Sequence, residues 1–140
     1  MEIEVKYDCA EVDWERVKDT LKQVGMGYHD AKIHKIAFEN SQVTVFLYSD
    51  NQMIGFGRAI SDGAYQAAIY DMAIIPKFQK NGLGKTIMKH IISKLPQCNI
   101  ILYASPGKEE FYKKLDFRRM KTGMAYFCNA DKMKEKGFTE

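Results

Sequence analysis

The chain changes its hydrophobic period near residue 80, and this change constrains its fold more than any other feature. Before it, three β-rich runs follow one another, QVTVFLY, MIGFGRAI and YQAAIYDMAII, with short turns between them. After it, an apolar stripe at helical spacing runs from Leu83 to Leu95, and the apolar run NIILYA follows. Short turns between strands predict an antiparallel meander. A strand, a helix and a second buried strand predict a βαβ unit, in which the two strands are parallel.

The flanking segments add further elements. IEVKYD predicts a first strand, Asp13 is a suitable cap for a helix, and a second helix is expected over residues 30–38. A helix capped by Ser105 is expected in SPGKEEFYKKL, and closing strands are expected at Phe117 and in GMAYFCN. The predicted class is α/β (α+β), with a mixed, mostly antiparallel sheet of about six or seven strands flanked by about four helices.

The length, the net charge and the cysteines of the chain limit the functions that it can have. The 140 residues predict a single domain, 1–140, and the net charge of +3 suits a small anionic ligand better than a nucleic acid. The acidic start lacks the apolar run of a signal peptide, and no stretch is apolar enough to span a membrane. The three cysteines show no metal-binding spacing, so no metal is expected, and the cytoplasm is the expected compartment.

The stretch FQKNGLGKT, residues 78–86, resembles three kinds of glycine-rich loop. A nucleoside triphosphate P-loop would need a glycine where Gln79 stands, and it would follow its strand almost directly. A dinucleotide-binding loop would need glycine or alanine where Ile87 stands. An ordinary turn that precedes a helix is the third interpretation.

A fourth pattern fits the whole region. The spacing Gln79-x-x-Gly82-x-Gly84, after a strand and before an amphipathic helix, resembles the Q/R-x-x-G-x-G/A signature of the GNAT superfamily of N-acetyltransferases. EEFYKKLDF resembles the later family motif F-Y-x-K-x-G-F, with Asp116 in place of the usual glycine. The order of predicted elements follows that family over nearly the whole chain. Asp116 is expected to adopt a left-handed conformation, which Asp tolerates better than most residues.

The physics of the loop agrees with this resemblance. A helix that begins at Gly82 directs unpaired N–H groups and a positive dipole end outward, and glycines at 82 and 84 allow phosphate oxygens to approach the backbone. In GNAT proteins the pyrophosphate is that of coenzyme A, and the thioester lies between splayed parallel strands four and five. The resemblance implies the following pyrophosphate site: Gln79, Lys80, Asn81, Gly82, Leu83, Gly84, Lys85 and Thr86. It also implies that the backbone of Met72, Ala73 and Ile74 binds the pantetheine arm.

Two further side chains are candidates for the chemistry. Tyr112 matches the tyrosine to which the family often assigns the role of general acid, and the other interpretation is an aromatic side chain packed against a strand. Asp71 lies among apolar residues in mid-strand, where it could accept the proton of the amine, bind a cationic substrate or pair with Arg58. The histidines at 29, 34 and 90 fall on presumed helices as surface or edge residues, with no assigned role.

The resemblance implies an acetyl-CoA-dependent N-acetyltransferase that transfers the acetyl group directly to a primary amine of a small molecule or peptide, through a ternary complex. The alternative is a non-catalytic acyl-CoA-binding or regulatory module on the same fold, because fold alone does not fix function. No nucleic-acid or membrane partner is expected. An exposed edge strand such as GMAYFCN could pair in a homodimer.

Overall fold

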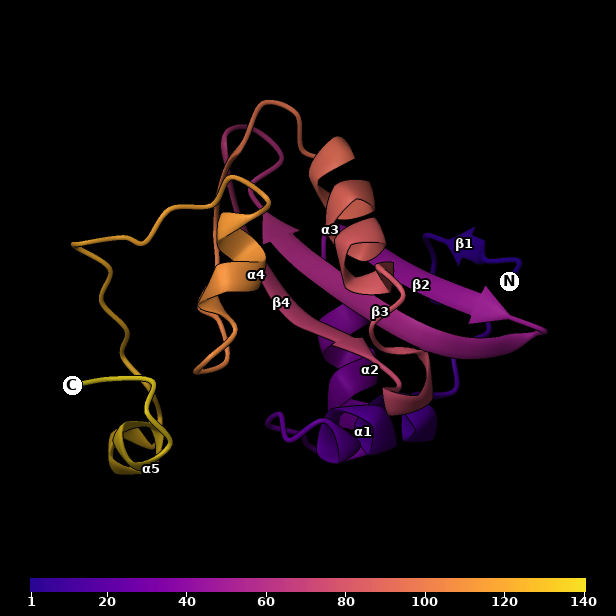
Figure 1. The fold of residues 1–140 in the computed structure, drawn as a ribbon, viewed down its shortest axis with the longest axis horizontal. Coiled ribbons are helices and arrows are strands. Elements are labelled where there is room, and N and C mark those ends of the chain that lie inside the picture. The colour runs from indigo at the N-terminus through magenta and orange to yellow at the C-terminus, as the bar shows by residue number, and fades with distance from the viewer. The chain divides into compact units, whose positions relative to one another are not determined.

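A computed structural model describes all residues, 1–140, and the chain forms two compact units. Residues 1–102 make up the larger unit, which carries the sheet and three helices, and residues 103–140 make up the smaller one. The helices are drawn as coils and the strands as arrows in Figure 1. In neither unit does a helix have the length and apolar character needed to cross a membrane.

The larger unit contains one five-stranded sheet in the order β1-β2-β3-β4-β5. The neighbours from β1 to β4 are antiparallel, and β4 and β5 are parallel. The strands are β1 (Glu4–Lys6), β2 (Val43–Ser49), β3 (Gln52–Ser61), β4 (Gln66–Ile74) and β5 (Asn99–Ile101). The predicted meander and the predicted parallel pair are therefore confirmed.

Helices α1 (Trp14–Gln23) and α2 (Ala31–Glu39) cover one face of this sheet. Helix α1 begins where the sequence predicts, because the side chain of Asp13 accepts a hydrogen bond from the amide of Arg16 at 3.1 Å. Fully buried apolar side chains of both helices and of the strands form the core on this face: Val17, Leu21, Phe38, Phe46 and Phe56.

Helix α3 (Leu83–Ser93) covers the other face, where it crosses in front of the strands in Figure 1. Two glycines of β3 allow this close approach. A Cβ atom on Gly57 would lie 3.0 Å from Ile87 and 3.1 Å from Ile91, and one on Gly55 would lie 3.2 Å from Ile87. Because these positions carry no side chain, α3 packs directly on β3, and its N-terminus is fixed relative to the end of β4.

The smaller unit contains α4 (Glu109–Lys113) and α5 (Ala130–Glu135). The helix predicted from Ser105 begins later than expected, because Gly107 has a φ of 92° and a residue in that conformation interrupts a helix. The prediction for Asp116 is confirmed by its φ of 69°. Tyr103 packs edge-on against Phe127 and Phe138, with ring centroids 5.5 and 5.8 Å apart.

The predicted closing strands do not form, so the sheet has five strands instead of the expected six or seven. Neither Phe117 nor GMAYFCN belongs to a strand, and Met124 and Tyr126 are 95% and 100% exposed. A strand exists only where a neighbouring strand supplies its hydrogen bonds, and sequence alternation alone does not provide that partner. The polar tail instead forms α5, which brings the helices to five and is capped by the side chain of Asn129.

Candidate functional site

The loop between β4 and α3 presents a row of free amide groups. A short 3₁₀ turn, η1 (Pro76–Phe78), leads into Lys80 and Gly82, which have φ values of 68° and 75°. Thr86 is the first residue of the helix whose amide bonds back, to the carbonyl of Gly82 at 3.1 Å. The amides from Lys80 to Lys85 consequently have no acceptor in the protein, and Gly82 provides no side-chain cap.

The polar side chains of this loop hold its shape. The amide group of Gln79 donates to the carbonyl of Ile74 at 3.0 Å, and that of Asn81 donates to the carbonyl of Phe78 at 3.1 Å. The hydroxyl of Thr86 donates to the Gly82 carbonyl at 3.1 Å. These three predicted site residues therefore shape the backbone, and the backbone presents the donors.

Positive charge surrounds the same donors. Lys80 and Lys85 are exposed, and neither forms an ion pair. The positive end of the α3 dipole adds to their field. Free amides, a helix N-terminus and two lysines together form a site that suits an anionic group such as a phosphate.

The adjoining edge of β4 is open over its second half. Strand β5 pairs with β4 only at Gln66, Ala67 and Ala68, so the two strands part beyond Ala68. On its other edge, β4 stays paired with β3, from Ser61 opposite Ala67 to Gly55 opposite Ile74. The splayed parallel pair that the family resemblance implies is present within the larger unit.

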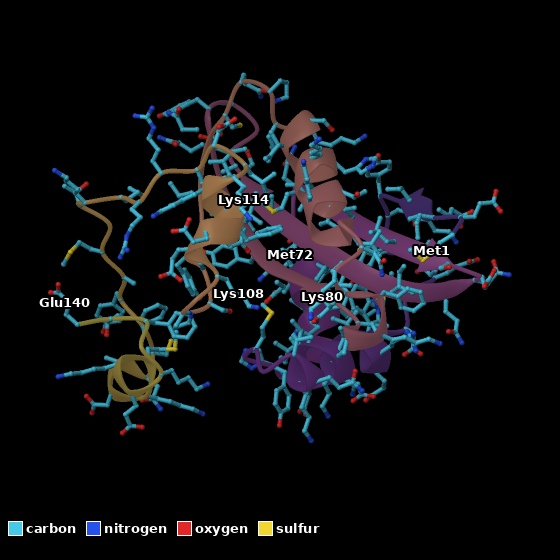
Figure 2. The ribbon with its side chains drawn as sticks, viewed as in Figure 1. Met1, Met72, Lys80, Lys108, Lys114 and Glu140 are labelled. Atoms are coloured by element: carbon cyan, nitrogen blue, oxygen red, sulfur yellow. The ribbon has the colours of Figure 1, made fainter.

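The register of β3 and β4 shows which backbone groups face the open edge. The amide of Ile75 donates to the Ile54 carbonyl at 2.8 Å, which marks a hydrogen-bonded pair. Since such pairs alternate along an antiparallel ladder, Ala73 bonds to β3 while Met72 and Ile74 face the other way. The bond from Gln79 to the Ile74 carbonyl agrees with this direction. Met72 of β4 and Lys80 of the loop are both labelled in Figure 2.

Asp71 lies in a β-bulge, which the sequence does not predict. The register of β4 shifts between the partners Phe56 and Arg58, so that Asp71 and Met72 lie opposite Gly57 alone. Asp71 has a φ of 55°, and its Oδ2 accepts a hydrogen bond from Arg58 Nε at 2.8 Å. Of the roles that the sequence left open for Asp71, the structure displays the pairing with Arg58.

His34 corrects one interpretation of the sequence. Its side chain was expected at the surface or at an edge, but it is buried, with 3% exposure, on the face of α2 that carries Phe38. The backbone N–H of His29 donates to its Nε2 at 2.9 Å, and burial lowers the pKa of the imidazole. The i, i+4 spacing of His34 and Phe38 was the signal that could have revealed this.

Tyr112 lies on α4 of the smaller unit. Its ring packs edge-on against Phe111 and Phe117, with centroids 5.0 and 6.0 Å away. Burial raises the pKa of its phenol, so the hydroxyl stays protonated at neutral pH. This state is the one that a proton donor requires.

The larger unit thus combines a meander that ends in a splayed parallel pair with a loop of unpaired amides at a helix N-terminus, the arrangement that the sequence resemblance implies. The family model described as an acetyltransferase (GNAT) domain matches residues 14–126. The chain therefore belongs to the GNAT acetyltransferase family.

Individual relatives agree with this assignment. The uncharacterized N-acetyltransferase ycf52 of Pyropia yezoensis is 37% identical over 121 residues, 81% of this chain and 63% of the relative. GCN5-related N-acetyltransferase 1, chloroplastic, of Arabidopsis thaliana is 30% identical over 108 residues, 74% of this chain and 55% of the relative. The solved structure of protein SA2161 from meticillin-resistant Staphylococcus aureus superposes with a TM-score of 0.79 at 26% identity, covering 90% of this chain and 98% of that one. The chain thus spans 63% and 55% of the length of these two curated relatives.

Proposed function

We propose that the protein is an acetyl-CoA-dependent N-acetyltransferase that transfers the acetyl group directly to a primary amine of a small molecule or peptide. The observation that carries the proposal is the continuity of the free loop amides with the open edge of β4, because the two together suit a long ligand with a pyrophosphate. The amides of residues 80–85 would hold the pyrophosphate, with Lys80 and Lys85 adding charge. The backbone of Met72 and the amide of Ile74, which face the open edge, would hold the pantetheine arm like an added strand, whereas the backbone groups of Ala73, the third residue that the resemblance implies, are bonded to β3.

The reaction needs three protein groups in this proposal. The ion pair with Arg58 uses Oδ2 of Asp71, and the second carboxylate oxygen, Oδ1, would accept the proton of the attacking amine. The amide of Met72 would donate to the carbonyl oxygen as negative charge develops there. Tyr112 would give its proton to the departing thiolate as the C–S bond breaks and the C–N bond forms.

We propose that residues 1–140 work as one domain. The family match, over residues 14–126, includes parts of both compact units. Tyr112 and the loop amides come from different units, so the proposed chemistry requires both. Expression of residues 1–102 alone tests this: acetyl-CoA binding without turnover is expected, and full turnover would contradict the proposal.

Binding of acetyl-CoA is the direct test of the function. Isothermal titration should give saturable binding of acetyl-CoA, and of coenzyme A, at submillimolar concentrations. ATP and NAD should bind far more weakly, because the P-loop and dinucleotide patterns are incomplete. A folded sample that binds no acetyl-CoA would overturn the proposal. A panel of primary amines, followed by thiol release, then identifies the acceptor.

The pairing of Asp71 with Arg58 supports a second candidate, a non-catalytic acyl-CoA-binding or regulatory module. The arginine partner occupies one carboxylate oxygen of Asp71, which makes that oxygen unavailable to an attacking amine. Tight acetyl-CoA binding with no thiol release above background, for every amine tested, would favour the module.

The compartment and the oligomeric state complete the proposal. We propose the cytoplasm, and the chloroplastic relative makes an organelle the competing location, which imaging of the tagged full-length protein would decide. We also propose a homodimer, because the large apolar side chains of Met124 and Tyr126 are exposed close together in the sequence. Light scattering coupled to gel filtration measures the mass, and a monomer at all concentrations would exclude the dimer.

A further inference from the structure

The bulge in β4 depends on an unusual conformation of one residue. Asp71 has a φ of 55°, which is uncommon for any residue other than glycine and costs free energy that the surroundings must supply. Its partners across the ladder are also irregular, because Asp71 and Met72 face the single residue Gly57. An interaction from outside β4 that stabilises Asp71 would offset this cost.

Arg58 is the group that holds it. Its Nε donates to Asp71 Oδ2 at 2.8 Å, and both side chains are largely buried, at 16% and 22% exposure. A charge-assisted hydrogen bond at this distance and burial is stronger than one at the surface. Arg58 of β3 lies opposite Tyr70 of β4, the residue directly before the bulge. Its ion pair with Asp71 therefore connects β3 to the bulged residue of β4.

Arg58 is itself fixed by three neighbours on the α2 side of the sheet. Its Nη1 donates to the hydroxyl of Ser41 at 3.3 Å. Its guanidinium lies 5.6 Å from the ring centroid of Phe38 and 5.3 Å from that of Tyr70. A planar guanidinium can stack on rings and bond a carboxylate at the same time, which an ammonium cannot do.

The bulge decides where the next amide points. Without the extra residue, the alternation of β4 would run unbroken and Met72 would bond to β3. With it, Ala73 bonds to β3 and Met72 faces the open edge. We propose that Arg58 is a positioning residue: through Asp71 it holds the bulge that directs the Met72 amide to the acyl group. This proposal rests on the proposed transferase function only for the identity of the group that the amide meets.

Nuclear magnetic resonance of the unliganded protein tests the geometry without any activity. Arg58→Met should move the amide resonance of Met72 and speed hydrogen exchange of the Ala73 amide, because the pairing of β4 with β3 next to the bulge weakens. The Thr86 amide, in α3, should not change. Arg118→Met, at an exposed arginine, is the control. An unchanged Met72 resonance in Arg58→Met would overturn the proposal.

A second substitution keeps the test decisive if Arg58→Met unfolds. Asp71→Gly in the Arg58→Met background removes the unpaired carboxylate, and glycine adopts a positive φ without strain. The double variant should recover the protection of the Ala73 amide. Failure to recover it in a folded double variant would show that Arg58 holds more than the bulge and would reject the mechanism.

Kinetics supply a separate measure once an acceptor amine is known. Arg58→Met should lower kcat by roughly 10- to 100-fold for every amine, with acetyl-CoA affinity retained, because misplacement of a donor affects the reacting geometry. Arg58→Lys should restore part of kcat. A loss confined to acetyl-CoA affinity would contradict the role assigned to Arg58. If no amine is acetylated at all, the transferase proposal fails, and the resonance of Met72 still decides the role of Arg58.

Discussion

Gln79 and Ile74 join the loop to the strand through one hydrogen bond. The side-chain amide of Gln79 donates to the Ile74 carbonyl at 3.0 Å, at the open edge of β4. It thereby occupies an acceptor that would otherwise point toward the proposed cofactor, and it fixes the loop that carries the free amides. This hydrogen bond explains why the first position of the loop signature holds a side chain that can donate one.

Gln79→Glu should weaken acetyl-CoA binding. A carboxylate cannot donate to the Ile74 carbonyl and would repel it, so we expect a loss of at least about 1 kcal/mol, roughly fivefold in Kd. Gln79→Arg, which keeps a donor and matches the other residue of the family signature, is the control and should bind nearly as the original does. Isothermal titration measures both. Equal affinity of Gln79→Glu and the unmodified protein would refute the structural role of this bond.

Gly82→Ala should reduce both stability and acetyl-CoA affinity. Gly82 has a φ of 75°, and a side chain in that conformation costs roughly 1–2 kcal/mol. Gly25→Ala is a matched control, because Gly25 has a φ of 80° and, like Gly82, nothing within 4 Å of the position that a Cβ atom would take. Both variants should lose similar stability in urea, and only Gly82→Ala should lose acetyl-CoA affinity. Loss of affinity in both would mean that the effect is global.

Tyr112→Phe should lower turnover by roughly 100-fold, the lower range for removal of a general acid, with acetyl-CoA affinity unchanged. Tyr126→Phe, at a fully exposed tyrosine (100%) of the same unit, is the control. Steady-state rates and titration separate the two effects. Because burial raises the pKa of the Tyr112 phenol, the rate should not decline through loss of this proton until the pH exceeds the ordinary tyrosine pKa. Unchanged turnover would remove Tyr112 from the mechanism.

Gly57→Ala should destabilise the larger unit by roughly 1–3 kcal/mol, because the added methyl group meets Ile87 at 3.0 Å and Ile91 at 3.1 Å. Gly27→Ala is the control, since Gly27 has open space around it. Urea denaturation followed by circular dichroism measures the difference. If the two variants were equally stable, the close packing of α3 on β3 would not depend on glycine.

Stability should fall below about pH 6.5 because of His34. Burial lowers the pKa of folded His34 below its ordinary value of 6.5, so the unfolded chain takes up the proton first as pH decreases. The free energy of unfolding is thus fully present above that value, declines by at most about 1.4 kcal/mol per pH unit, and levels off once folded His34 is protonated. Urea denaturation at several pH values should show a smaller decline for His34→Gln than for His29→Gln, the exposed control. If the free energy of unfolding declined equally with pH in the two variants, protonation of His34 would not be the cause of the decline.

The order of elements could be predicted because it depends on local patterns. The apolar stripe of α3, the short turns of the meander, the cap at Asp13 and the glycines of the loop can each be recognised from residues that are close together in the sequence. The closing strands could not be predicted reliably, because a strand depends on a partner elsewhere in the chain. Helix α4 is shorter than the sequence predicts, because Gly107 adopts a positive φ.

The family, the meander followed by a parallel crossover, and the loop with its unpaired amides can be inferred from the sequence, since each follows from spacing along the chain. The conformation of Asp71, the burial of His34 and the position of Arg58 between Ser41, Phe38 and Tyr70 are visible only in the folded chain. These depend on contacts between β3, β4 and α2, which bring together residues that are distant in the sequence. The direction of the Met72 amide follows from those contacts and from no local pattern.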